Sequence, residues 1–150
     1  MKLMGFNFTK IHAEKKEAQI QKININTNID ISDIHKVKSD ILKTKEEIIA
    51  VSFDYSINYD PGYAKIDFAG VVLVSLEQKE SEEVIKMWKE KQIPENFKVS
   101  IFNVILKKSS LRSLQLEEEL NLPTHVPMPS LKVNSQVSSN APVTTDTKKK

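Results

Sequence analysis

The sequence contains no cysteine and only three glycines among its 150 residues. Without cysteine the chain has no disulfide, no thiolate ligand for zinc and no cysteine nucleophile, and it suits a reducing compartment. Three glycines are too few for a loop that cradles phosphate groups, and neither GxGxxG nor GxxxxGK occurs. We therefore predict a cytoplasmic protein that has no nucleotide site and no bound cofactor.

Long apolar runs are missing as well. No stretch of about 18 apolar residues occurs, so we expect no transmembrane helix. The first residues, Met1–Phe6, include a basic residue but lack the apolar region that a secretory signal requires. The length suits one domain, which we place at residues 1–131. Residues 132–150, rich in Ser, Thr and Lys and free of aromatics, are predicted to be a disordered tail.

The positive charge is concentrated in that tail. The net charge is +2, of which residues 132–150 supply +3, leaving −1 for residues 1–131. A domain that binds nucleic acid normally carries its positive charge on its folded surface. The distribution therefore argues against a duplex-binding module. A ribosome- or RNA-associated accessory protein, anchored by Lys148–Lys150, stays open as the second functional hypothesis.

Apolar side chains alternate with polar ones over residues 47–76, in two segments that meet at Asp60-Pro61-Gly62-Tyr63. A period of two predicts two strands, each with one buried face. Pro-Gly supplies the fixed φ and the positive φ of a tight turn. If Asp60 faces Tyr63, both apolar sets lie on one sheet face. The expected partners are then Tyr59 with Ala64, Ile57 with Ile66, Tyr55 with Phe68, Phe53 with Gly70, and Val51 with Val72.

Two further strands are expected before this hairpin, at residues 3–12 and 20–31, because both segments alternate. Residues 32–45 suggest a turn and an irregular crossover, with residues 40–42 touching the core. The fold class is therefore α+β, a four-stranded antiparallel sheet with a long central hairpin, packed by two C-terminal helices.

The first of these helices is expected to start at an N-cap, Ser81, and to end at Pro94, which can begin the next helix. The second helix has apolar residues on more than one side from Phe97 onward, which indicates burial by more than one partner. We expect a break or bend at residues 109–110, continuation of the apolar stripe at Leu111, Leu114 and Leu120, and residues 117–119 in solvent. Residues 122–129 contain three prolines and should form an extended strap, with Leu122, Val126 and Met128 against the body.

The sequence gives no positive support for a catalytic or metal-binding site. The histidines, His12, His35 and His125, lack the spacing of metal ligands on one element. Asp54 and Asp67 are diagonal neighbours in the proposed register and could act as an acid–base pair. We favour the simpler interpretation, in which they stay solvated beside Lys65. The sequence therefore predicts a protein that is not an enzyme.

The aromatic residues of the helices allow two interpretations. Trp88, Phe97 and Phe102, together with Met87, could be ordinary core or could line an exposed groove or subunit interface. Each hairpin strand is longer than the usual five or six residues. A long sheet with unpaired edges needs a cover, and oligomerisation is a common one.

Three short motifs, in this order, resemble the SecB-type family of protein-export chaperones over roughly residues 4–131. They are Phe68-Ala69-Gly70-Val71-Val72-Leu73, Phe102-Asn103-Val104-Ile105-Leu106 and Leu120-Asn121-Leu122-Pro123. The chain departs from the family in having Ala69-Gly70 in place of a double glycine, in its three terminal lysines and in its proline-rich strap. These departures favour a divergent member, archaeal or associated with a toxin–antitoxin system.

The resemblance implies a protomer that assembles into dimers and tetramers. It also implies a holdase that keeps unfolded or preprotein chains in hydrophobic grooves without using nucleotide, in some members on the way to export. We do not transfer the family's docking residues for an export motor. Six residues are the predicted client-binding or oligomer-interface positions: Trp88, Phe97, Phe102, Leu106, Val126 and Met128.

Overall fold

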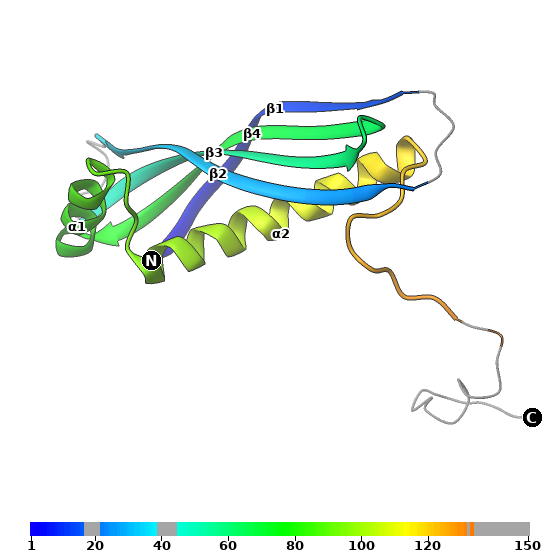
Figure 1. Cartoon of the computed structure of the whole chain (residues 1–150). Coiled ribbons are helices and arrows are strands. Elements are labelled where there is room, and N and C mark those ends of the chain that lie inside the picture. The colour runs from blue at the N-terminus through cyan, green and yellow to red at the C-terminus, as the bar shows by residue number, and fades with distance from the viewer. Residues whose placement is uncertain (17–21, 39–44, 132, 134–150) are drawn as a thin grey trace, which may run out of the picture.

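The computed structural model describes residues 1–16, 22–38, 45–131 and 133 of the chain. Four strands, β1 (Lys2–Lys15), β2 (Asn24–Val37), β3 (Glu46–Asp60) and β4 (Ala64–Glu77), precede the helices α1 (Gln78–Trp88) and α2 (Glu95–Glu119). The strands form one antiparallel sheet in the order β1-β4-β3-β2. In Figure 1, α2 runs across one face of the sheet and α1 lies at one end. The predicted fold class is confirmed.

The central hairpin has the predicted register. All five expected pairs are present, from Tyr59 opposite Ala64 to Val51 opposite Val72. The turn is closed by the Tyr63 N–H, which donates to the Tyr59 carbonyl oxygen at 2.8 Å, and Gly62 has the positive φ of 66° that the turn requires. Both apolar sets are buried on the face that α2 covers, so the hairpin forms the centre of the core.

Gly70 lies where aromatic rings cross the sheet. It pairs with Phe53 on β3 and with Phe8 on β1, and the centroids of these two rings are 6.4 Å apart. A Cβ at Gly70 would lie 2.6 Å from the Asn7 carbonyl oxygen and 2.7 Å from Phe53 Cζ. Backbone crowds the position from one side and a phenyl ring from the other, so only glycine fits without displacement.

The predicted turn after residue 31 is wrong, because β2 continues to Val37. The register shifts between Ile31 and Asp33, so that Ile31 faces Phe53 while Ile34 faces Val51. Both isoleucines are buried. One extra residue forms a β-bulge, which interrupts the alternation in the sequence while keeping both side chains on the core face. The expected core contacts of residues 40–42 lie outside the described residues.

The boundaries predicted for the first helix are also wrong. α1 follows β4 directly, with Glu77 at the N-cap, and Ser81 is fully buried inside the helix. α1 ends well before Pro94, in a Schellman turn: the Gln92 N–H donates to the Met87 carbonyl oxygen at 3.0 Å and the Lys91 N–H to that of Trp88 at 2.8 Å. Pro94 then occupies the N-cap position of α2.

α2 is continuous through residues 109–110, so the expected break is absent. Its buried side chains follow a four-residue spacing: Phe97, Ile101, Ile105, Ser109, Ser113 and Glu117, with Leu116 beside the last. Two predictions fail with this spacing. Leu111, expected to continue the apolar stripe, is 58% exposed, whereas Glu117, expected in solvent, is fully buried. Neither helix in the described part of the chain is both long and apolar enough to cross a bilayer.

We predict that Gly70→Ala lowers the free energy of unfolding by about 1–3 kcal/mol, because the methyl group must push against backbone and a packed ring. Gly5→Ala is the matched control, since a Cβ there meets only ordinary contacts with Leu73, the nearest at 3.7 Å. Urea unfolding of both variants measures the difference. Equal stability of the two variants would contradict this view of the aromatic cluster.

Candidate functional site

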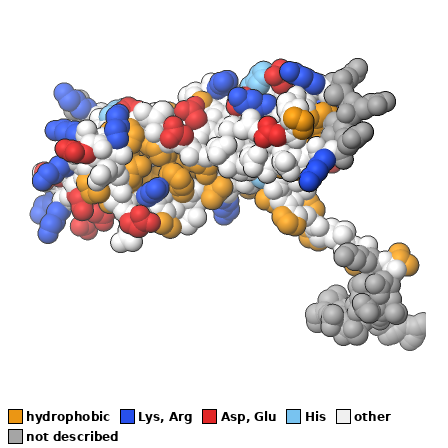
Figure 2. Space-filling view, in the orientation of Figure 1, with side chains coloured by type: hydrophobic (Ala, Val, Ile, Leu, Met, Phe, Trp, Pro, Cys, Tyr) orange, Lys and Arg blue, Asp and Glu red, His pale blue; other side chains and the backbone are white. Residues whose placement is uncertain are grey.

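A groove of about 460 Å³ lies between the edge strand β2 and the two helices. Its apolar lining comes from Ile29 and Ile31 of β2, Trp88 of α1, Phe102 of α2 and Ile93 between the helices. Figure 2 shows hydrophobic side chains gathered between β2 and α2, next to α1. Apolar side chains that converge in a concave site are typical of binding sites for ligands or peptides.

Lys91 and Lys98 add positive charge to the lining of the groove. Asp30 of β2 also borders it, but Asp30 pairs with Asp54 and lies between Ile29 and Ile31, so its carboxylate is directed to the opposite face of the sheet. The Lys91 ammonium lies 4.5 Å from the centroid of the Trp88 ring, and the Lys98 ammonium lies 5.7 Å from that of Phe102. Both are cation–π distances. The lysine side chains therefore partly cover the two aromatic rings and place positive charge beside them.

The predicted site residues fall into three places. Trp88 and Phe102 meet in the groove, and Leu106 lies one turn beyond Phe102 on α2, 40% exposed. Phe97 is buried in the core and lines a different pocket. Val126 and Met128, expected against the body, are 37% and 55% exposed on the strap, so that expectation holds only for Leu122, which is buried.

The sequence does not indicate that four of the lining residues belong to the groove: Ile29, Ile31, Lys91 and Lys98. Alternation over residues 20–31 is consistent with Ile29 and Ile31 on one face of a strand, but no pattern in the sequence indicates that they meet residues of the helices. Lys91 has a left-handed backbone with φ 59°, and Lys98 follows the start of α2. The sequence does not show that a loop lysine lies over an aromatic ring, because this contact depends on the direction that the chain takes after the Schellman turn.

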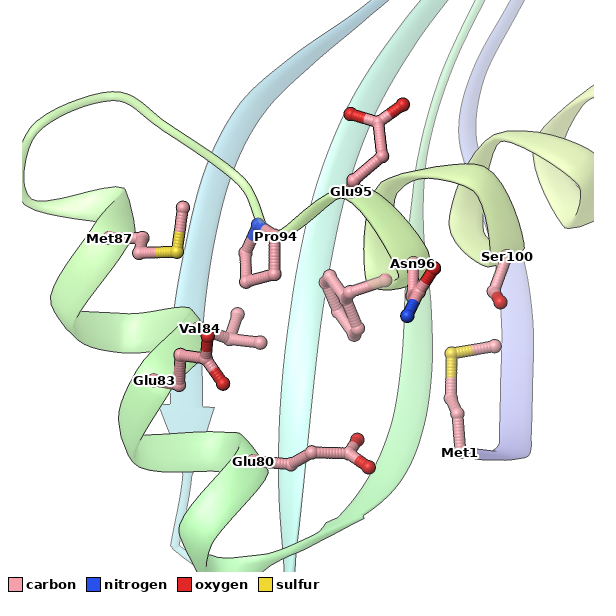
Figure 3. A pocket seen from close by; sticks show the side chains of 10 residues that line it. Met1, Glu80, Glu83, Val84, Met87, Pro94, Glu95, Asn96 and Ser100 are labelled. Atoms are coloured by element: carbon pink, nitrogen blue, oxygen red, sulfur yellow. The ribbon is translucent and has the colours of Figure 1, made fainter.

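The second pocket, of about 540 Å³, lies between α1 and the start of α2 (Figure 3). Its apolar lining includes Val84, Met87, Pro94 and Phe97. Met1 approaches from the β1 side. Glu80 and Glu83 reach toward it from α1, and Glu95 stands at the first turn of α2. The two cavities thus differ in charge, since lysines border the groove while glutamates border this pocket.

The strap is held by a buried polar cluster around Glu117. The Tyr59 hydroxyl lies 2.5 Å from Glu117 Oε2 and 2.8 Å from the Pro123 carbonyl oxygen, so its one proton serves two acceptors. The His125 backbone N–H donates to Glu117 Oε2 at 3.1 Å, and His125 Nδ1 lies 2.9 Å from the same oxygen. Glu117 therefore joins β3, α2 and the strap, a structural role that leaves Tyr59 and Glu117 closed to solvent.

The remaining candidates for chemistry lie outside the groove and outside the second pocket. His12 contacts Glu14, and His35, which lies on β2 and not in the expected loop, contacts Asp33 at 2.9 Å. Among the residues that the structure describes, no group of three or more His, Asp or Glu side chains could hold a metal ion. Asp67 lies beside Lys65 at 3.3 Å, as expected, but its side chain is half-buried and not solvated as predicted. Asp54 is exposed on the face of the sheet away from the core, opposite Ala69.

No protein-family model matches the chain, and no curated protein matches it either. Its structure is similar to that of a SecB-like chaperone from Mycobacterium tuberculosis, solved in complex with a ChAD peptide from the HigA1 antitoxin. The two align with a TM-score of 0.52 over 86% of this chain and 89% of the other, at 13% sequence identity. At this identity the likeness shows that the chain has a SecB-like fold.

Burial and the contact with Glu117 raise the pKa of Tyr59, and burial raises that of Tyr55. As the pH rises above the ordinary tyrosine value of 10.0, the unfolded chain loses these protons first. The stability they supply is complete below that pH and is lost above it, at up to about 1.4 kcal/mol per pH unit for each tyrosine.

We therefore predict that the free energy of unfolding declines above about pH 10 and that Tyr59→Phe flattens the decline, with Tyr55→Phe adding to the effect. Urea unfolding at a series of alkaline pH values measures the slope of the unfolding free energy against pH. Loss of the Tyr59 hydrogen bond lowers that free energy at every pH, whereas proton linkage changes the slope. The same slope in wild type and in both variants would contradict the assignment.

Proposed function

We propose that this protein is a holdase-type chaperone that binds extended apolar segments of unfolded or preprotein chains without using nucleotide. The observation that carries the proposal is the groove lined by Trp88, Phe102 and Ile93 beside the open edge of β2. The SecB-like fold supports it, because a protein of that fold has been solved with a bound peptide.

The edge of β2 supplies the polar half of such a site. Within the described residues, β2 pairs with β3 along one edge and has no strand at its other edge. Ile29–Ile31 of β2 border the groove. An extended client can add to such an edge through main-chain hydrogen bonds, which are independent of sequence. Every second side chain of the client then points toward the groove. Main-chain pairing combined with apolar burial suits a protein that must accept many different sequences.

The groove is small for a tight binder. Burying one large apolar side chain contributes about 1.5–3 kcal/mol, whereas association costs about 4–15 kcal/mol in lost motion. One groove that holds few side chains therefore binds weakly. Several grooves in one assembly would raise the apparent affinity for a long unfolded chain, because later contacts become intramolecular.

We propose accordingly that the protein forms homo-oligomers, dimers that pair into tetramers. Val99 and Leu106 lie seven positions apart on one side of α2, and they are 50% and 40% exposed. Val126 and Met128 add exposed apolar surface on the strap. Apolar helix surface of this kind is what a second copy would cover.

Sedimentation or light scattering should give two or four times the mass of one chain. Replacing Val99 and Leu106 together by Glu places charges in the proposed interface and should lower the mass toward that of the monomer. The exposed pair Lys107→Glu and Lys108→Glu controls for charge on the same helix. A strictly monomeric wild type at micromolar concentration would contradict the oligomer proposal.

Purified protein in excess should suppress aggregation of a chemically denatured client in the absence of nucleotide. Phe102→Asp should weaken suppression at least severalfold, because it puts a carboxylate into the apolar groove. Leu111→Asp is the matched control, an exposed apolar residue of the same helix that does not line the groove. No suppression by the wild type would refute the proposed function.

Trp88 lines the groove and is the only tryptophan of the chain, so its fluorescence reports directly on the groove. A client peptide without tryptophan or tyrosine should shift the Trp88 emission to shorter wavelengths as water leaves the ring. Binding that leaves this emission unchanged would place the client site elsewhere.

A further inference from the structure

We propose that Lys91 and Lys98 make the groove selective for client segments in which acidic residues flank apolar ones. This inference rests on the proposed function and names the class of segment that the same site prefers. It starts from the charge on the groove. The lining contains two lysine side chains, whereas the carboxylate of Asp30 is directed to the face of β2 opposite to Ile29 and Ile31.

Both ammonium groups are available to a ligand. In the described part of the chain neither Lys91 nor Lys98 forms an ion pair, since the salt bridges found there involve other residues. Each ammonium lies instead over an aromatic ring of the groove floor. An apolar client side chain that reaches Trp88 or Phe102 therefore comes close to a lysine. A carboxylate on a neighbouring client residue gains a charge-assisted contact there, whereas a client ammonium is repelled.

The backbone at Lys91 is the second observation. Lys91 occupies the left-handed position of the Schellman turn after α1, with φ 59°, where glycine is the usual residue. A residue with a side chain is disfavoured in this conformation. The turn places the ammonium of this residue back over Trp88, three positions earlier in the chain. The strained position thus carries the side chain that covers the ring, and strain of this kind points to a functional constraint.

The second pocket shows that the positive charge is local to the groove. On the other side of the connection between the helices, Glu80, Glu83 and Glu95 border the larger pocket. A client with acidic flanks is therefore directed to the groove and repelled from the neighbouring pocket. The formal charge of the domain as a whole, −1 over residues 1–131, would not by itself attract an acidic segment.

Three labelled peptides test the proposal, with the same core of alternating apolar residues and with flanks of Glu, Ser or Lys. Fluorescence anisotropy at low ionic strength should rank their affinities Glu over Ser over Lys. Two exposed charge pairs predict about a 5- to 50-fold difference between the Glu- and Lys-flanked peptides. High salt should shrink it.

Variants assign the preference to the two lysines. Lys91→Asn with Lys98→Gln should abolish the ranking, with Asn chosen because it tolerates the left-handed conformation. Lys91→Glu with Lys98→Glu should reverse it. The control pair Lys107→Glu and Lys108→Glu makes the same charge change on exposed positions of α2 outside the groove and should keep the ranking. Circular dichroism checks that each variant is folded.

The possible results separate this inference from the proposed function. Equal binding of all three peptides, tighter binding of the Lys-flanked peptide, or a ranking that the control pair also abolishes would overturn the selectivity and leave client binding standing. Failure of every peptide to bind, together with no suppression of aggregation, would overturn the proposed function itself. Affinity that falls as the protein concentration rises would show that a second copy occupies the groove, and would overturn the assignment.

Discussion

The four-residue spacing of buried side chains on α2 determines how the molecule is assembled. An α-helix turns about 100° per residue, so side chains four apart drift by about 40° around its axis. A row of this kind is inclined to the axis and packs across a surface that turns beneath it. A β-sheet has such a twist. The buried row of α2 runs from Phe97 to Glu117. Figure 1 shows the helix crossing the sheet diagonally, so each end of α2 meets different neighbours.

Both functional features follow from this crossing. Near its start, α2 presents the flank with Lys98 and Phe102 to β2, where α1 and the connecting segment complete the groove. Near its end, the buried side has rotated to Glu117, which takes Tyr59 and His125 as partners and ties down the strap. The groove and the open edge of β2 lie near the start of α2, whereas the polar cluster around Glu117 lies near its end. The binding site and the anchored strap are thus separated along one helix.

An element of the fold is predictable from the sequence where its local pattern and its tertiary packing agree. The hairpin register was predictable pair by pair, because strict alternation and a Pro-Gly turn leave one arrangement that buries both faces. The end of β2 was missed, because a single bulge residue at position 32 imitates the end of a strand. The sequence predicts Glu117 in solvent, because a period of 3.6 and a run of three glutamates both indicate a solvated surface. Only the four-residue row that starts at Phe97 could have indicated otherwise.

The candidate site was predictable in part for a related reason. Trp88 and Phe102 stood out as aromatics on helices with more than one apolar side, whereas their lysine covers depend on a turn after α1 that no local signal marks. Val126 and Met128 were expected against the body by the general preference of apolar residues for cover. The cluster at Glu117 anchors the strap through Pro123 and His125, and Val126 and Met128 beyond them are left exposed.

The central claim is that a client chain occupies the groove and pairs with the open edge of β2. Hydrogen exchange followed by mass spectrometry, with and without a saturating unfolded client, tests it most directly. The claim predicts that amides around Ile29–Ile31 become protected when the client binds, together with those around Ile93, while the outward amides of β1 at the opposite edge keep their exchange rates. Protection confined to other regions, or no protection in a sample that demonstrably holds the client, would contradict it.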